Sequence, residues 1–246
     1  MLATPATGPL TRPRWSVVVA APRAPGAGSF GRLAAPVPAT GSDCAGGALG
    51  LVSQADAACR WILGASSPAE LLQRSVVAAC ELLEVPLSWV AVISGGELHV
   101  AAHHGLRSTD VAKLWCMPIG AGLAGRVAAT GETILVHDWQ EDPRRIPGSP
   151  SIVEAEGVRS GIVAPLVSAA GIHGVLALGD RRLRDMVPIK VAVATEMAAR
   201  VGEALRDPVD RPRYPGLGAS GLLRRIRKRF SRAAVGVLER AGRGNP

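Results

Sequence analysis

The spacing of apolar residues changes from helical to extended at Pro86, and this change constrains the fold more than any other feature. Ser67 can cap a helix, Pro68 suits the first helical position, and Glu70 completes a capping-box pattern. Apolar residues then recur three or four positions apart, with charged residues between them. Residues 68–83 are therefore predicted to form an amphipathic helix that ends before Pro86.

An extended pattern follows this helix directly. Residues 88–93 and 97–103 flank a Gly95-Gly96 pair, which is typical of a β-hairpin. Further along the chain we expect a helix over 51–63, short helices over 108–114 and 122–129, a strand over 133–137, a proline-bearing loop, a second hairpin over 158–167 and 172–178, and a closing helix over 186–205. Pro165 indicates an edge position or a bulge in its strand. The order of elements predicts an α+β fold, an antiparallel sheet with helices packed on it.

The net charge of +8 is distributed unevenly along the 246 residues. Residues 49–205 carry 13 basic and 16 acidic residues, whereas residues 206–246 carry eleven basic and three acidic ones. A slightly acidic folded segment argues against nucleic-acid binding by its own surface. No apolar run approaches the ~20 residues of a membrane span, and no convincing signal peptide is present, so a cytoplasmic location is expected.

Three regions are expected. Residues 1–48, rich in Ala, Pro and Gly, are predicted to be disordered; residues 49–205 form the folded domain; residues 206–246 form a basic tail. Within the tail, apolar residues at helical spacing between 222 and 237 alternate with Arg224, Arg225, Arg227, Lys228 and Arg229. This basic amphipathic pattern, over 222–240, suits an anionic membrane surface, nucleic acid or an acidic protein; the alternative is a solvated, disordered tail.

Two motifs that suggest chemistry have simpler explanations. The sequence from Gly120 to Gly125 matches G-x-G-x-x-G, but too few residues follow for the helix of a dinucleotide-binding crossover, so tight turns and close packing explain its glycines better. His99 and His103 would lie roughly 13 Å apart along a strand, too far to share one metal ion. The four cysteines, Cys44, Cys59, Cys80 and Cys116, are widely spaced, so neither a zinc site nor a disulfide framework is indicated.

Three segments together resemble the GAF domains of bacterial regulators and sensor kinases: Met117–Asp138, with the sequence MPIGAGLAGRVAATGETILVHD, Glu156–Leu166, with EGVRSGIVAPL, and Gly171–Leu178, with GIHGVLAL. The resemblance covers approximately residues 66–205. It implies a six-stranded antiparallel sheet with helices on one side and a ligand pocket on the other. The roof of that pocket would be residues 115–119 and 139–158.

The resemblance says less about the ligand. Bilin-binding, haem-binding and cyclic-nucleotide-binding members need residues that are missing from the matching positions of this chain. The family's enzymes, the free methionine sulfoxide reductases, use cysteines around the pocket; Ala124 stands where they have one in the glycine turn. A redox enzyme of that kind, using Cys80 and Cys116, is one alternative function, and a membrane or nucleic-acid tethered adaptor acting through the tail is another.

The main hypothesis is a non-enzymatic sensory module that binds a small ligand or a partner, in signal transduction or transcriptional regulation. The cofactor and the small molecule are unknown, and a homodimer through the helices that bracket the domain is expected. The residues expected to bind the ligand are Trp115, Met117, Trp139, Ile152 and Val153, with Arg159 as the anchor for an anion. The alternative is that both tryptophans only pack under the roof.

Overall fold

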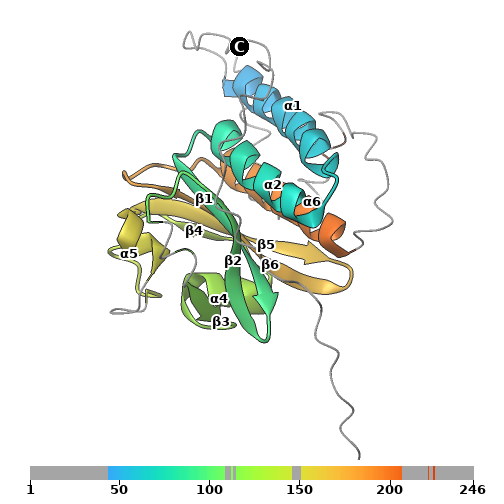
Figure 1. Ribbon diagram of the computed structural model, residues 1–246. Coiled ribbons are helices and arrows are strands. Elements are labelled where there is room, and N and C mark those ends of the chain that lie inside the picture. Colours follow the sequence, from blue (N-terminus) through green and yellow to red (C-terminus); the bar gives the residue numbers. More distant parts are fainter. Residues whose placement is uncertain are drawn as a thin grey trace, which may run out of the picture.

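Six antiparallel strands form one sheet, and helices pack on both of its faces (Figure 1). The computed structural model describes residues 44–108, 112, 115–145, 151–206, 221 and 224. Its elements are α1 (Cys44–Leu63), α2 (Pro68–Leu83), β1 (Leu87–Ser94), β2 (Glu97–His104), β3 (Cys116–Pro118), α4 (Gly122–Thr130), β4 (Ile134–Val136), α5 (Ile152–Glu156), β5 (Ser160–Ser168), β6 (Gly171–Asp180) and α6 (Pro188–Arg206). The predicted α+β class is confirmed.

The two predicted hairpins form the centre of the sheet. The strand order is β3-β2-β1-β6-β5-β4, so β1 of the first hairpin pairs with β6 of the second. Pro165 lies in β5 beyond Val163, where the pairing with β4 ends, and a register shift follows between Leu166 and Val167. Pro165 thus has both features that its missing N–H predicted, an unpaired side and a nearby irregularity.

Helix α2 begins and ends where the sequence predicts. The Ser67 hydroxyl accepts a hydrogen bond from the Glu70 N–H, at 3.1 Å. The Glu70 carboxylate does not return to Ser67, as a full capping box requires, but accepts from the N–H and hydroxyl of Ser66. At the other end Glu84 adopts a left-handed conformation, with φ of 56°, and stops the helix before Pro86.

Helix α1 is longer than predicted. It begins at Cys44 rather than Leu51 and so includes the last five residues of the region 1–48, which was expected to be disordered. Glycines in the first two turns weakened the helical pattern, but packing of Val52 and Ala55 in the core stabilises the helix. Residues 1–43 lie outside the described residues.

Each face of the sheet has its own hydrophobic core. Helices α2 and α6 cover one face of the sheet, and α1 packs on both of these helices. The opposite face is covered by α4, α5 and the segments around β3, which Figure 1 shows at the lower left. The role of the bracketing helices in a homodimer stays a prediction.

Two other predictions fall mostly on residues that the structure does not describe. In the short helix expected over 108–114, Ala112 is helical and its N–H donates to the Ser108 carbonyl at 3.2 Å. In the tail, Gly221 and Arg224 are helical, and Arg224 is exposed; Arg225, Arg227, Lys228 and Arg229 lie outside the described residues. No helix in the described part of the chain combines the length and apolar character needed to cross a membrane.

Candidate functional site

A cavity of about 60 Å³ lies on the sheet face opposite α1, α2 and α6. The residues around it come from the sheet (Trp89, Val163), from the segment at β3 (Trp115, Met117), from α4 (Gly122, Leu123, Ala124), from the β4–α5 segment (Trp139, Arg145, Ser151) and from α5 (Ile152, Val153, Glu154). One water needs roughly 10–15 Å³ of such space, so the cavity admits a few waters or a small organic group.

Five of the six residues expected to bind a ligand line this one cavity: Trp115, Met117, Trp139, Ile152 and Val153. They come from three separate segments, which the sheet and the short helices bring together. The expected roof over 115–119 and 139–158 therefore lies against the cavity where the structure describes it. Whether these side chains bind a ligand stays a prediction.

Arg159 was expected to anchor an anion in the pocket, but the residues that line the cavity do not include it. Its guanidinium binds Asp138 instead, with 2.7 Å between Nη2 and Oδ2 and 3.2 Å between Nε and Oδ1. The hydrogen bond from Arg159 lowers the pKa of Asp138 below its usual value. The Arg159 carbonyl also accepts a hydrogen bond from the backbone N–H of Trp139, at 2.7 Å. Arg159 thus holds the start of the β4–α5 segment and does not line the cavity.

Trp89 and Arg145 are among the lining residues that sequence reasoning did not assign to the site. Trp89 lies on β1, where Leu87, Trp89 and Ala91 belong to the core on the cavity side and Val90 to the core on the other side. This alternation was readable in the sequence and assigns Trp89 to one face, although it does not say which face carries the cavity. Arg145 follows Arg144 in a loop, and nothing in the pattern distinguishes the two.

The glycine run at the start of α4 shapes the wall of the cavity. Gly120 and Gly122 have positive φ angles, of 89° and 54°, which favour glycine. A Cβ at Gly125 would lie 2.3 Å from the Pro118 carbonyl oxygen, so only glycine lets α4 approach β3 this closely. Turns and close packing explain the motif, as predicted.

The cavity lining offers little reactive chemistry. None of the described cysteines lines the cavity. Ala124, which does line it, has a methyl group at the position in the glycine turn where the free methionine sulfoxide reductases have a cysteine. Cys80 lies in the core on the other face of the sheet, where burial raises its pKa to about 11, and Cys116 is exposed on β3. Among the described residues, no three His, Cys, Asp or Glu side chains are placed to hold a metal ion together.

A family model described as GAF domain matches residues 65–206, more than half of the chain. The chain belongs to the GAF domain family. The match agrees with the six-stranded antiparallel sheet and with the residues that carried the resemblance, and it places the protein among sensory and regulatory modules of signalling proteins. Among curated proteins, no relative matches the chain.

Solved structures show the same fold. The GAF domain of a phosphoenolpyruvate-protein phosphotransferase from Coxiella burnetii is 21% identical, with a TM-score of 0.58 over 65% of this chain and 95% of that one. A putative GAF sensor protein from Burkholderia vietnamiensis is 20% identical, with a TM-score of 0.53 over 69% and 100%. The free methionine-R-sulfoxide reductase of Neisseria meningitidis, solved with its substrate, is 21% identical, with a TM-score of 0.52 over 65% and 89%.

Proposed function

We propose that this GAF domain is a non-enzymatic, cytoplasmic sensor that binds a small molecule in the cavity under α4 and α5. The observation that carries the proposal is the convergence of three buried tryptophans, Trp89, Trp115 and Trp139, on one cavity in a sensory fold. Aromatic rings supply large apolar contact area, and a concave, mostly apolar site with few polar groups is typical of ligand pockets.

The alternative of a methionine sulfoxide reductase has less support. Such chemistry needs a thiolate at the substrate, because the thiolate is the nucleophile. Cys80 is buried on the far side of the sheet with a raised pKa, and Cys116 does not line the cavity. The neighbour from Neisseria meningitidis therefore supports the fold of this chain more than its chemistry.

A route from the cavity to α6 supports a signalling role. Helix α5, which lines the cavity, ends at Glu156, and Glu156 binds Arg181 at the beginning of the segment between β6 and α6. A ligand that moves α5 would act on this contact. We propose that ligand binding changes the position of α6 through it.

Native mass spectrometry of the freshly purified full-length protein tests the binding proposal. We expect a small molecule to copurify with the wild type and to be absent from Ala124→Phe, because Ala124 lines the cavity and a phenyl ring would fill it. Ala129→Leu is the matched control, since Ala129 is exposed on the same helix. A bound molecule retained by Ala124→Phe, or no binding by the wild type in a thermal-shift screen, would contradict the proposal.

A further inference from the structure

Two buried hydrogen-bond donors of the cavity-lining tryptophans have no acceptor in the part of the chain that the structure describes. The indole N–H groups of Trp89 and Trp139 are shielded from solvent and have no hydrogen-bond partner among the described residues. The two residues are only 4% and 9% exposed, and both line the cavity. Buried donors are nearly always paired in folded proteins, because an unpaired one loses its bonds to water without compensation. Two such donors at one cavity point to a ligand that carries acceptors.

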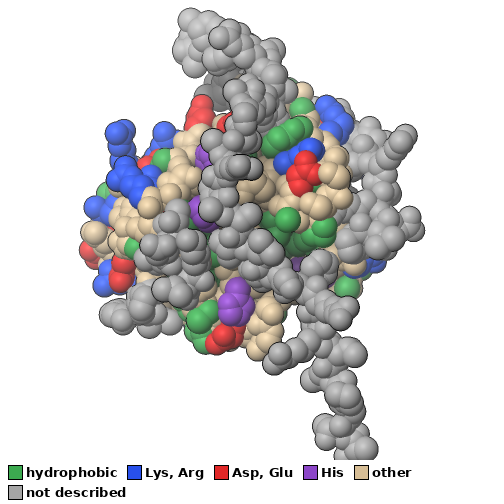
Figure 2. Space-filling view, in the orientation of Figure 1, with side chains coloured by type: hydrophobic (Ala, Val, Ile, Leu, Met, Phe, Trp, Pro, Cys, Tyr) green, Lys and Arg blue, Asp and Glu red, His purple; other side chains and the backbone are tan. Residues whose placement is uncertain are grey.

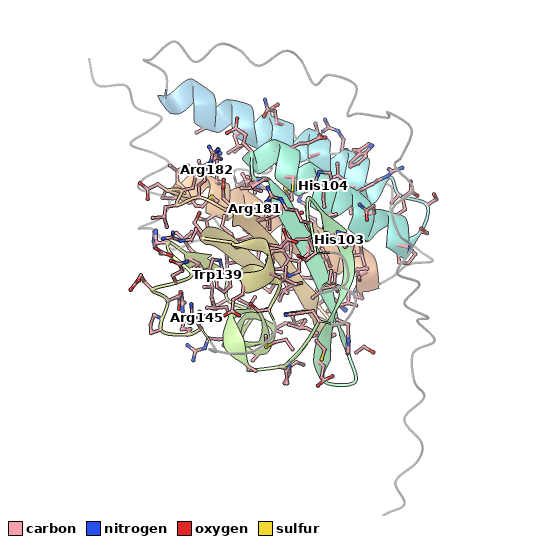
Figure 3. The ribbon with its side chains drawn as sticks, turned by 60° about the vertical axis from the view of Figure 1, so that its left-hand side comes forward. His103, His104, Trp139, Arg145, Arg181 and Arg182 are labelled. Carbon is pink, nitrogen blue, oxygen red and sulfur yellow. The ribbon has the colours of Figure 1, made fainter. Side chains whose placement is uncertain are left out.

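A cation at the rim of the cavity has no counterion among the described residues. Arg145 lines the cavity and is exposed, and no carboxylate of the described residues lies within ion-pair distance of it. The two aspartates of its segment bind other arginines: Asp142 binds Arg144, at 2.5 Å, and Asp138 binds Arg159, at 2.7 Å. Figure 3 shows Trp139 and Arg145 on the same side of the molecule. Arg145 is therefore available to an anionic ligand.

The charge at the rim favours a ligand with a single negative charge. Glu154 of α5 also lines the cavity and is exposed, so the rim has one basic and one acidic side chain. A second carboxylate on the ligand would meet Glu154 without a second cation to offset the repulsion. Figure 2 shows both basic and acidic side chains along its left edge, the side where Figure 1 shows α5.

We propose that the cavity binds a small organic monocarboxylate with a hydrogen-bond acceptor at the end opposite its carboxylate. The carboxylate pairs with Arg145 and accepts from Trp139 at the rim, the apolar body contacts the aromatic lining, and the distal hydroxyl or carbonyl accepts from Trp89 on the sheet. Both N–H groups are shielded from the open space of the cavity, so the proposal requires each indole to turn toward the ligand on binding. This inference rests on the proposed function and specifies its ligand class.

Matched probes and tryptophan resonances test the inference on the full-length protein. Selective ¹⁵N labelling gives one indole signal for each of the five tryptophans, assigned with Trp→Phe variants. The probes are 4-hydroxybenzoate, benzoate without the distal acceptor, 4-hydroxybenzamide without the charge, and terephthalate with a second carboxylate. A second set of probes has an aliphatic chain in place of the ring and tests a narrower ligand. Its members, in the same order, are 5-oxohexanoate, hexanoate, 5-oxohexanamide and adipate.

We expect the first member of at least one set to shift the Trp89 and Trp139 signals and to bind at least about tenfold more tightly than its amide or its dicarboxylate. Arg145→Gln should remove this preference for the acid and leave amide binding unchanged. Arg126→Gln is the control, because Arg126 is exposed on α4 and does not line the cavity.

Three results would overturn the inference: equal binding of acid and amide, equal effects of Arg145→Gln and Arg126→Gln, or no shift of either tryptophan signal at millimolar acid. The failure of the ligand class is distinguishable from the failure of the proposed function. A neutral molecule that copurifies with the wild type and is lost in Ala124→Phe would refute the carboxylate and leave the sensor proposal standing.

Discussion

Glu156 at the end of α5 forms an ion pair with Arg181, with 2.5 Å between Glu156 Oε2 and Arg181 Nη2. The other carboxylate oxygen accepts from the backbone N–H groups of Arg107 and Ser108, at 2.7 Å and 2.6 Å. Burial acts to raise the pKa of Glu156, but these three partners outweigh it and the pKa is lowered. One buried side chain thus joins α5 to the segments that follow β2 and β6.

Glu156→Gln should destabilise the fold by about 2–4 kcal/mol, because it leaves the Arg181 guanidinium without a carboxylate in a largely buried position. The free energy of unfolding in urea measures this. Glu154→Gln is the control on the same helix and should change stability by less than about 0.5 kcal/mol, since Glu154 is exposed. Equal effects of the two changes would show that the ion pair does not hold α5.

Acid should weaken the fold partly through Glu70. Hydrogen bonds from the hydroxyl and N–H of Ser66 lower the pKa of Glu70 from 4.5 to about 2. A carboxyl with a depressed pKa stabilises the folded state above its unfolded pKa and loses that contribution as the pH falls through the folded value. Stability should therefore fall between pH 4.5 and 2, and less steeply in Glu70→Gln.

Glu70→Gln should keep part of the dependence of stability on pH, since Asp138, Asp142 and Glu156 also have lowered pKa values. Glu81→Gln, an exposed change on the same helix, is the control and should follow the wild type. Urea unfolding at several pH values measures all three proteins. Identical slopes for wild type and Glu70→Gln would refute the role of Ser66.

Two helical glycines should respond in opposite ways to alanine. A Cβ at Gly202 of α6 would lie 2.4 Å from the Val167 nitrogen, so Gly202→Ala forces α6 away from β5 and should destabilise by about 1–3 kcal/mol. A Cβ at Gly50 of α1 meets nothing within 4 Å, so Gly50→Ala should stabilise by about 0.5–1 kcal/mol. Thermal unfolding distinguishes the two, and changes of the same sign would contradict the packing of α6.

The parts of the fold with a clear local signal were predictable from the sequence. Extended apolar runs on either side of glycine turns located β1, β2, β5 and β6, and a capped apolar stripe located α2. Strand β3 was not found from the apolar pattern, because three residues are too few to show an alternation. Its extended conformation depends on pairing with β2. Helix α5 was missed although Ser151 and Glu154 match a capping box and Gly157 ends the helix in a left-handed conformation.

Part of the apolar lining of the site was predictable, and its charged part was not. Five lining residues followed from the resemblance to the GAF domains, because the roof segments of a fold keep their place relative to its strands. The choice between Arg159 and Arg145 depends on which arginines the aspartates bind, and the pair of Asp138 and Arg159 joins residues 21 positions apart. Local sequence carries no information about such a pair.

Cys116 and Cys80 should differ sharply in their reactivity toward thiol reagents. This difference tests the alternative of a redox enzyme, which would use both cysteines. In a Cys44→Ser background, a disulfide reagent at pH 8 should modify Cys116 quickly, because its side chain is exposed. Cys59 and Cys80 should react only after unfolding, since both are buried and burial raises the pKa of Cys80 to about 11. Cys116→Ser should remove the fast phase and Cys80→Ser should leave it unchanged. A second fast thiol that disappears in Cys80→Ser would mean that Cys80 is accessible and ionised, which a redox pair requires and the packing of α2 against the sheet prevents.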